Sequence, residues 1–179
     1  MTEDTAFDAA VAAHRQALTA YIASATQMAA TRWNAARDVG KWSPAEITEH
    51  LRLSYVPAIA ELAGQGGFRM RTPRWQQLLL RLWYLPRILR RGRMPTGVPA
   101  VREVRPGNGP FDQHALLLAL QAAGEQFLDA LGAARSRPSQ RVTHPFLGKL
   151  TLAEGLGLST AHLRHHHQQL DGAAGTGPV

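Results

Sequence analysis

Four stretches of the chain repeat apolar residues at helical intervals, and this pattern constrains the fold more than any other feature of the sequence. In the first stretch Phe7, Val11 and Leu18 follow that spacing, and no Gly or Pro interrupts it. Two later stretches begin with capping-box signatures, SPAE and TLAE, whose hydroxyl and carboxylate groups can bond the free amides of a first helical turn. The predicted helices span residues 6–32, 43–63, 112–135 and 151–170.

The segments between these helices complete the domain organisation. Residues 73–92 predict a further helix that is kinked or broken at Pro86. Residues 33–41 and 136–150 are interpreted as connectors, and no strand pattern competes with the helices. The sequence therefore predicts an all-α fold, a four-helix bundle. Residues 1–170 would form one domain, residues 69–110 a basic Pro/Trp-rich insertion between the second and third main helices, and residues 171–179 a disordered tail.

Positive charge is concentrated in that insertion. The chain carries a net charge of +7, but residues 69–105 hold ten arginines and one acid, which leaves −2 for the rest. Such a segment suits a solvated surface whose tryptophans pack on the bundle, a site for an anionic ligand, or contact with a membrane surface or nucleic acid. The sequence has no recognisable DNA-reading motif, and neither nucleic acid nor a membrane surface is expected as a partner.

Several classes of protein are excluded by composition. The chain has no cysteine, so disulfides and thiolate metal sites are excluded, and a metal would need histidine or carboxylate ligands. The N-terminal sequence MTEDTAFDAA lacks the basic and then apolar layout of a signal peptide. No run of about 18 apolar residues predicts a membrane span. A cytoplasmic location is therefore expected.

Four histidines gather in the last predicted helix, in the sequence LSTAHLRHHHQQL. On a helical wheel His162 and His166 lie one turn apart at the edge of the core-facing stripe, and His50 takes the same place on the second helix. Three imidazole nitrogens from two helices suit Zn²⁺ or a similar divalent ion with one coordination position left open. The neighbours of these histidines on the wheel are small, which predicts space beside the imidazoles: Ser54, Gly155 and Ser159.

Each of these histidines also has a simpler interpretation. A single histidine at a core edge, such as His50, more often makes a structural hydrogen bond than a metal bond. A histidine pair at positions i and i+4 is common by chance. The run from His165 to His167 is typical of exposed tracts that bind nickel adventitiously.

Two motifs resemble signatures of the DinB/YfiT-like metalloenzyme superfamily. WSPAEITEHL, from Trp42 to Leu51, resembles the second-helix motif, and HLRHHHQQL, from His162 to Leu170, resembles the fourth-helix motif. The resemblance covers essentially the whole chain. It implies an antiparallel four-helix bundle with an unusual connection order. It also implies a metal held by one histidine of the second helix and an H-x-x-x-H pair of the fourth, which correspond here to His50, His162 and His166.

The resemblance also bears on activity. Characterised relatives include S-transferases dependent on bacillithiol or mycothiol, a maleylpyruvate isomerase among them. We therefore expect a divalent-metal-dependent enzyme, either a thiol-dependent S-transferase or a hydrolase of small molecules. Zinc or nickel is the expected metal, with iron or manganese as alternatives, and a low-molecular-weight thiol is a candidate second cofactor. The alternative is a non-catalytic bundle, a metal-binding stress protein or an interaction protein whose basic arm contacts a partner.

The catalytic group would be a water or thiolate activated by the cation, because the sequence offers no obvious general base. His165, His167 and Glu46 are candidates for acid–base roles, although the capping box gives Glu46 a structural role that competes with catalysis. Three arginines are candidates for binding an anionic substrate or thiol cofactor: Arg87, Arg90 and Arg91. We expect a small, anionic substrate and a homodimer, for which the interface candidates are Leu80, Trp83 and Tyr84.

Overall fold

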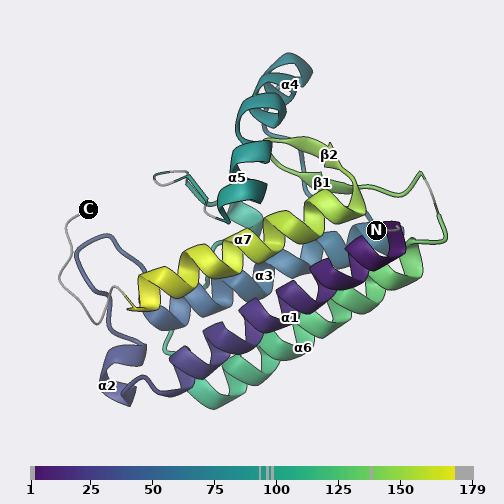
Figure 1. Ribbon diagram of the computed structural model, residues 1–179. Helices are drawn as coiled ribbons and strands as arrows, with labels where there is room; N and C mark the ends of the chain where they lie inside the picture. The colour runs from purple at the N-terminus through teal and green to yellow at the C-terminus, as the bar shows by residue number, and fades with distance from the viewer. Residues whose placement is uncertain (1–2, 93, 96, 98, 138, 172–179) are drawn as a thin grey trace.

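Four long helices form a bundle in the computed structural model, which describes residues 3–92, 94, 95, 97, 99–137 and 139–171 (Figure 1). The prediction of a four-helix bundle is therefore confirmed. The long helices are α1 (Glu3–Thr26), α3 (Pro44–Leu62), α6 (Gln113–Ala134) and α7 (Leu152–Asp171). The shorter elements are α2 (Ala30–Trp33), α4 (Arg74–Trp83), α5 (Leu85–Arg91), the 3₁₀ helix η1 (Arg102–Val104), β1 (Val142–His144) and β2 (Gly148–Leu150).

Both predicted capping boxes are present. The Ser43 amide donates to Glu46 Oε2 at 2.7 Å, and the Glu46 amide donates to Ser43 Oγ at 3.2 Å. The same exchange joins Thr151 and Glu154, over 2.8 and 3.2 Å. These bonds satisfy amides that a first helical turn leaves free, so α3 and α7 begin where the sequence predicts.

The first and second long helices, α1 and α3, lie diagonally across the bundle, and so do the third and fourth, α6 and α7, whereas the second and third are neighbours. Ser24 Oγ contacts His167 Nε2 at 2.7 Å, and His14 Nδ1 contacts Thr160 Oγ1 at 3.1 Å, so α1 and α7 are parallel neighbours. The helices α3 and α6 are also parallel neighbours, whereas α1 runs antiparallel to α6 and α3 antiparallel to α7 (Figure 1). This order agrees with the unusual connection order that the resemblance implies, and it brings the second and fourth long helices together.

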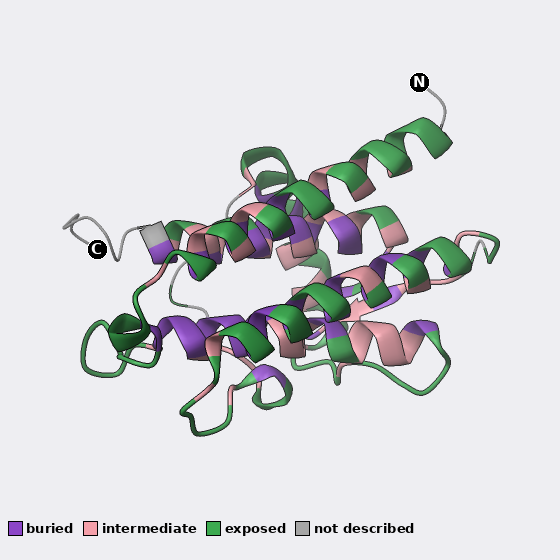
Figure 2. Ribbon diagram, turned by 90° about the horizontal axis from the view of Figure 1, so that it is seen from below, coloured by how far each residue is buried: buried purple, intermediate pink, exposed green. Residues whose placement is uncertain are grey.

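The core lies along the inward faces of the four long helices. Figure 2 shows buried residues on those faces and exposed residues on the outward ones. Leu51 of α3, Leu120 of α6 and Leu163 of α7 are among the most buried side chains. At the contact between α1 and α6, a Cβ added at Gly124 would lie 2.5 Å from Leu18 Cδ2, so a larger residue would force the Leu18 side chain to shift.

Two short helices follow α3 and stand at one side of the bundle. The predicted break at Pro86 is confirmed, because α4 ends at Trp83 and α5 begins at Leu85, with the proline in its first turn. The helix α5 packs on α7 through Leu85 and Ile88, which are buried. By contrast, none of the ten residues of α4 is buried. Leu80, a candidate for the dimer interface, is half-buried against the core.

Two sequence interpretations of secondary structure need correction. The segment 136–150 contains an antiparallel hairpin, in which Val142 pairs with Leu150 and His144 with Gly148. Its strands are three residues long, too short for periodicity to reveal. The first predicted helix ends at Thr26, and a separate turn, α2, occupies residues 30–33. The predicted tail, 171–179, lies outside the described residues except for Asp171, which ends α7.

No helix in the described part of the chain combines the length and the apolar character that crossing a bilayer requires.

Candidate metal centre

Three imidazoles meet where α3 passes α7. Because these helices are antiparallel neighbours, His50 on α3 faces His162 and His166, which lie one turn apart on α7. His162 Nε2 lies 3.0 Å from His50 Nε2 and 3.0 Å from His166 Nε2. One nitrogen from each ring thus converges on a common point, and these ligand atoms all lie within 4.8 Å of one another.

Hydrogen bonds at the far side of two rings fix their orientation. His50 Nδ1 lies 2.8 Å from the Val104 carbonyl oxygen, and His166 Nδ1 lies 2.8 Å from Gln169 Oε1. Both partners are acceptors, so each Nδ1 carries a proton and donates. Both Nε2 atoms therefore present a lone pair toward His162. This is the arrangement by which proteins orient histidine ligands for a metal.

Burial keeps the three rings neutral. Loss of solvation is the main cause that lowers the pKa of His50, and the bond to Val104 opposes it in part. Burial likewise lowers the pKa of His166 to about 3, with a contribution from the nearby His50. The pKa of His162 is held well below its usual value by burial first and by the neighbouring histidines second. Neutral imidazole is the form that binds metal ions.

The geometry suits a divalent cation better than a purely hydrogen-bonded cluster. Two nitrogens that bind one zinc ion tetrahedrally at about 2.0–2.1 Å lie roughly 3.3 Å apart, close to the two 3.0 Å separations. Without a cation, His50 and His166 would both present lone pairs to one nitrogen of His162. That nitrogen carries at most one proton in the neutral ring, so it cannot satisfy both acceptors fully.

Contrary to the sequence interpretation, the space at Gly155 is filled. A Cβ added at Gly155 would lie 2.3 Å from Val142 Cγ2, so this glycine admits the hairpin against α7. Ser54 Oγ donates to the His50 carbonyl oxygen at 2.8 Å. A hydrogen bond from Ser159 partly opposes the rise that burial causes in the pKa of Tyr55. These residues serve packing and hydrogen bonding.

The other two histidines of α7 lie on different sides of the helix. His165 is half-buried, and its Nε2 accepts from Gln169 Nε2 at 3.2 Å. The same Gln169 also bonds His166, so the amide connects His165 to the three-histidine cluster. His167 instead faces α1, where its Nε2 contacts Ser24 Oγ at 2.7 Å. An acid–base role at the cluster therefore fits His165 better than His167.

A cavity of about 360 Å³ adjoins the cluster through Trp42, whose ring centroid is 4.9 Å from that of His50. Its lining also includes Glu46, Arg105 and Asn108. Glu46 uses one carboxylate oxygen in the capping box and faces the cavity as well. The guanidinium group of Arg105 and the amide of Asn108 in this lining suit an anionic ligand.

The arginines proposed from the sequence as ligand-binding residues make local contacts. Arg87 donates to the Trp83 carbonyl oxygen, and its guanidinium carbon lies 5.1 Å from the centroid of the Trp83 ring. Arg90 Nε donates to the Pro86 carbonyl oxygen at 3.2 Å. Arg91 lies on the same short helix and is exposed. Arg105, rather than these three, lines the cavity beside the cluster.

Two groups that contribute to the site could not be predicted from the sequence. The carbonyl group of Val104 orients His50, yet backbone carbonyls carry no side-chain signal and the contact spans 54 residues. Trp42 lies within the WSPAE motif, but the cavity that it lines beside His50 is completed by the loop from residue 99 to residue 108.

Comparison with known proteins agrees with this fold. Residues 11–172 match a family described as protein of unknown function (DUF1569). YfiT from Bacillus subtilis, described as a probable metal-dependent hydrolase with an unusual four-helix bundle topology, is similar in structure, with a TM-score of 0.60 and 13% identity. The match covers 97% of this chain and 88% of YfiT.

A second solved structure, TT2238, is described as a four-helix bundle protein. It has a TM-score of 0.53 and 20% identity, and the match covers 96% of this chain and 99% of that one. At these identities both likenesses concern the fold, and at that level the resemblance to the DinB/YfiT-like superfamily is confirmed. No curated protein shows significant similarity to the sequence.

Proposed function

This chain belongs to the DUF1569 family. We propose that it is a divalent-metal-dependent hydrolase of a small molecule. The observation that carries the proposal is the convergence of three buried imidazole nitrogens from α3 and α7. The likeness of the fold to YfiT, itself described as a probable metal-dependent hydrolase, supports the same reaction class. His50, His162 and His166 are the proposed ligands.

Three neutral histidines leave a divalent ion with its full charge, and when bound such an ion acts as a Lewis acid and lowers the pKa of water toward neutrality. The role of this chain's residues would be to hold the ion and to orient its histidine ligands. The Val104 carbonyl and Gln169 hold His50 and His166 with their Nε2 lone pairs inward. Zinc or nickel suits an all-nitrogen donor set, and iron or manganese suits it less well.

Proton transfer would involve His165. Its ring centroid lies 5.1 Å from that of His166, and Gln169 bonds both rings. Because His165 is only half-buried, it can exchange protons with solvent while remaining connected to the cluster. Its pKa is lowered by burial, which favours the neutral form that accepts a proton.

The cavity beside Trp42 is the proposed substrate site. Its volume of about 360 Å³ suits a small molecule, and Arg105 and Asn108 offer donors to an anionic group. Arg105 Nε already donates to the Ala100 carbonyl oxygen at 3.0 Å, which positions its guanidinium within the loop. We propose a small substrate whose anionic group lies at Arg105 and Asn108, away from the carboxylate of Glu46. The homodimer expected from the sequence remains a prediction.

The first experiment measures metal content and hydrolysis together. Protein purified without a histidine tag should contain about one divalent ion per chain and hydrolyse members of a panel of small esters, amides and lactones. Chelation should abolish the activity, and His50→Ala should abolish both metal content and activity. Protein without bound metal, or His50→Ala with unchanged metal content, would contradict the proposal.

A second arm separates hydrolysis from thiol transfer. The same panel is assayed with and without bacillithiol, mycothiol or glutathione as co-substrate. Turnover that needs no thiol supports the hydrolase, whereas turnover that occurs only with a thiol assigns the site to an S-transferase. Arg105→Gln should raise KM for anionic substrates while leaving metal content unchanged, because Arg105 lines the cavity and is not a proposed ligand.

A further inference from the structure

The helix α4 is amphipathic, but it presents its apolar side to solvent. Toward the protein, Gln77 Nε2 donates to the Thr72 carbonyl oxygen at 2.6 Å, and Arg81 bonds both the Lys149 carbonyl oxygen and the Glu154 carboxylate. Arg81 thus attaches the polar side of α4 to the β-hairpin by a hydrogen bond and to α7 by an ion pair. This is the reverse of the usual orientation of a helix on a globular core.

The outward side of α4 forms a continuous apolar surface, which we call the α4 apolar face. Trp75 is 63% exposed, Leu82 63% and Trp83 61%. The spacing of these residues places them along one side of the helix, and α4 stands apart from the bundle in Figure 1. The α4 apolar face consists of Trp75, Leu78, Leu79, Leu82 and Trp83, all of them exposed.

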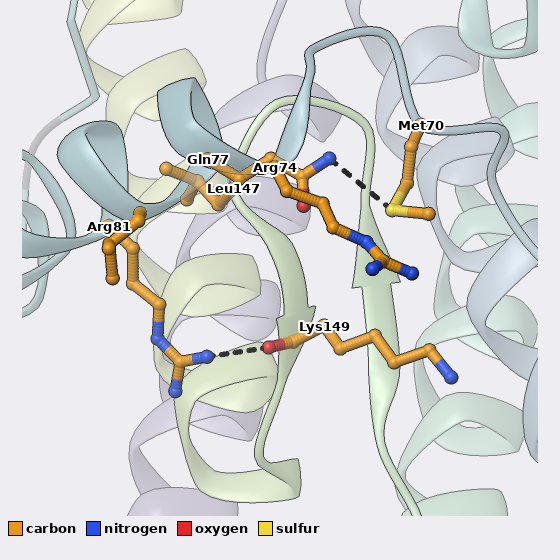
Figure 3. Close-up of a pocket in the computed structure, with 7 residues that line it drawn as sticks. Met70, Arg74, Gln77, Arg81, Leu147 and Lys149 are labelled. Atoms are coloured by element: carbon orange, nitrogen blue, oxygen red, sulfur yellow. Dashed lines mark hydrogen bonds between the residues drawn. The ribbon is translucent and has the colours of Figure 1, made fainter.

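Cations surround this face. A cavity of about 460 Å³ opens between α4 and the hairpin, and Leu78 belongs both to its lining and to the α4 apolar face (Figure 3). Arg74 and Lys149 line the same cavity, and within the described part of the chain neither has an ion-pair partner. Beyond the other end of α4, Arg90 and Arg91 are exposed on α5.

The charge of the region decides which partner fits. Residues 69–105 carry ten arginines and one acid, so two copies of this face would repel one another in a symmetric contact. Nucleic acid would leave the tryptophans and leucines without an apolar environment. Trp and Leu on one side of a protruding helix, with arginines around them, are the features of helices that lie in the headgroup region of an anionic bilayer.

We propose that the α4 apolar face docks the protein onto an anionic lipid bilayer, with Arg74, Lys149, Arg90 and Arg91 contacting lipid phosphates. The proposal is independent of the three-histidine cluster. The sequence offered membrane contact as one interpretation of the basic insertion, but a membrane surface was not the expected partner. Another interpretation had the tryptophans packed on the bundle, whereas Trp75 and Trp83 are exposed.

Co-sedimentation of the full chain with lipid vesicles tests the proposal. At about 0.1 M NaCl, vesicles of phosphatidylcholine with roughly 30% phosphatidylglycerol should bind at least about tenfold more tightly than pure phosphatidylcholine, and about 0.5 M NaCl should weaken the binding. The variant Leu79→Ser/Leu82→Ser should lose binding about tenfold or more, because it removes apolar groups that insert. Equal binding to both vesicles, or no binding to either, would overturn the proposal.

Matched control variants show whether binding depends on the α4 apolar face and its cations or on exposed apolar and charged residues in general. Val39→Ser/Leu118→Ser removes two exposed apolar side chains elsewhere and should bind like the wild type. Arg90→Gln/Arg91→Gln should lose binding about tenfold, whereas Arg37→Gln/Lys41→Gln, two exposed cations between α2 and α3, should not.

The arginine variant keeps the test decisive if the leucine variant does not fold. Loss of binding in the control pairs to the same extent as in the test pairs would refute a localised docking face. Light scattering, which measures the oligomeric state, tests whether a second copy of the chain occupies the α4 apolar face instead. A wild-type dimer that Leu79→Ser/Leu82→Ser converts to monomer would identify the face as a dimer interface and overturn the proposal.

Discussion

Replacing His162 by alanine should remove tight binding of a divalent metal. The Nε2 atom of this residue lies 3.0 Å from the corresponding atoms of both His50 and His166, so it occupies the central position of the cluster. Zinc bound by four protein ligands contributes an apparent 10–16 kcal/mol, or on the order of 3 kcal/mol per ligand. The loss of one ligand therefore corresponds to a decrease in affinity of more than about 100-fold.

Thermal unfolding with and without zinc measures this difference. At a free zinc concentration about 100-fold above Kd, binding stabilises the wild type by about 2.7 kcal/mol. For a chain of 179 residues this raises Tm by about 5–10 °C. At the same zinc concentration a variant with about 100-fold weaker binding gains roughly 0.4 kcal/mol, or about 1 °C.

Each protein is compared with itself, with and without metal, because the loss of a buried imidazole also changes stability without metal. His114→Ala is the matched control, since His114 is an exposed histidine of α6 and its loss should leave the zinc-induced shift intact. A shift in His162→Ala as large as in the wild type would refute the assignment of this residue as a ligand. So would a wild type that zinc does not stabilise.

Three further predictions concern single residues. Gln169→Leu should weaken metal binding by about 10–100-fold with the fold intact, because it removes the acceptor that orients His166; an unchanged Kd in metal titration would contradict this. Gly155→Ala should lower the free energy of unfolding in urea by about 1–3 kcal/mol, because its Cβ would lie 2.3 Å from Val142 Cγ2, and adding Val142→Ala should restore part of the loss. Burial lowers the pKa of His14 from its usual 6.5 to about 4, so the unfolded chain takes up this proton first as the pH falls. Wild-type stability should then decrease between about pH 6.5 and pH 4, with a share of roughly 3 kcal/mol from this residue that His14→Gln, which cannot ionise, does not show.

The long helices and the candidate ligands were predictable because their signals are local. A capping box such as that of Ser43 and Glu46 joins residues three positions apart, and the helical period places His162 and His166 on one side whatever the rest of the chain does. The choice of His50 as the third member also rests on a wheel position. That His50 reaches the α7 pair, however, depends on how α3 and α7 pack.

The tertiary structure alone decided the orientation of parts that long-range contacts hold. The bond between His50 and the Val104 carbonyl group joins residues 54 positions apart, and the hairpin that fills the space at Gly155 has strands too short to leave a period. The sequence of α4 contains the amphipathic pattern, but it does not determine which side of the helix faces water. The bonds of Arg81 to the hairpin and to α7 settle that, because they hold the polar side of the helix against the protein.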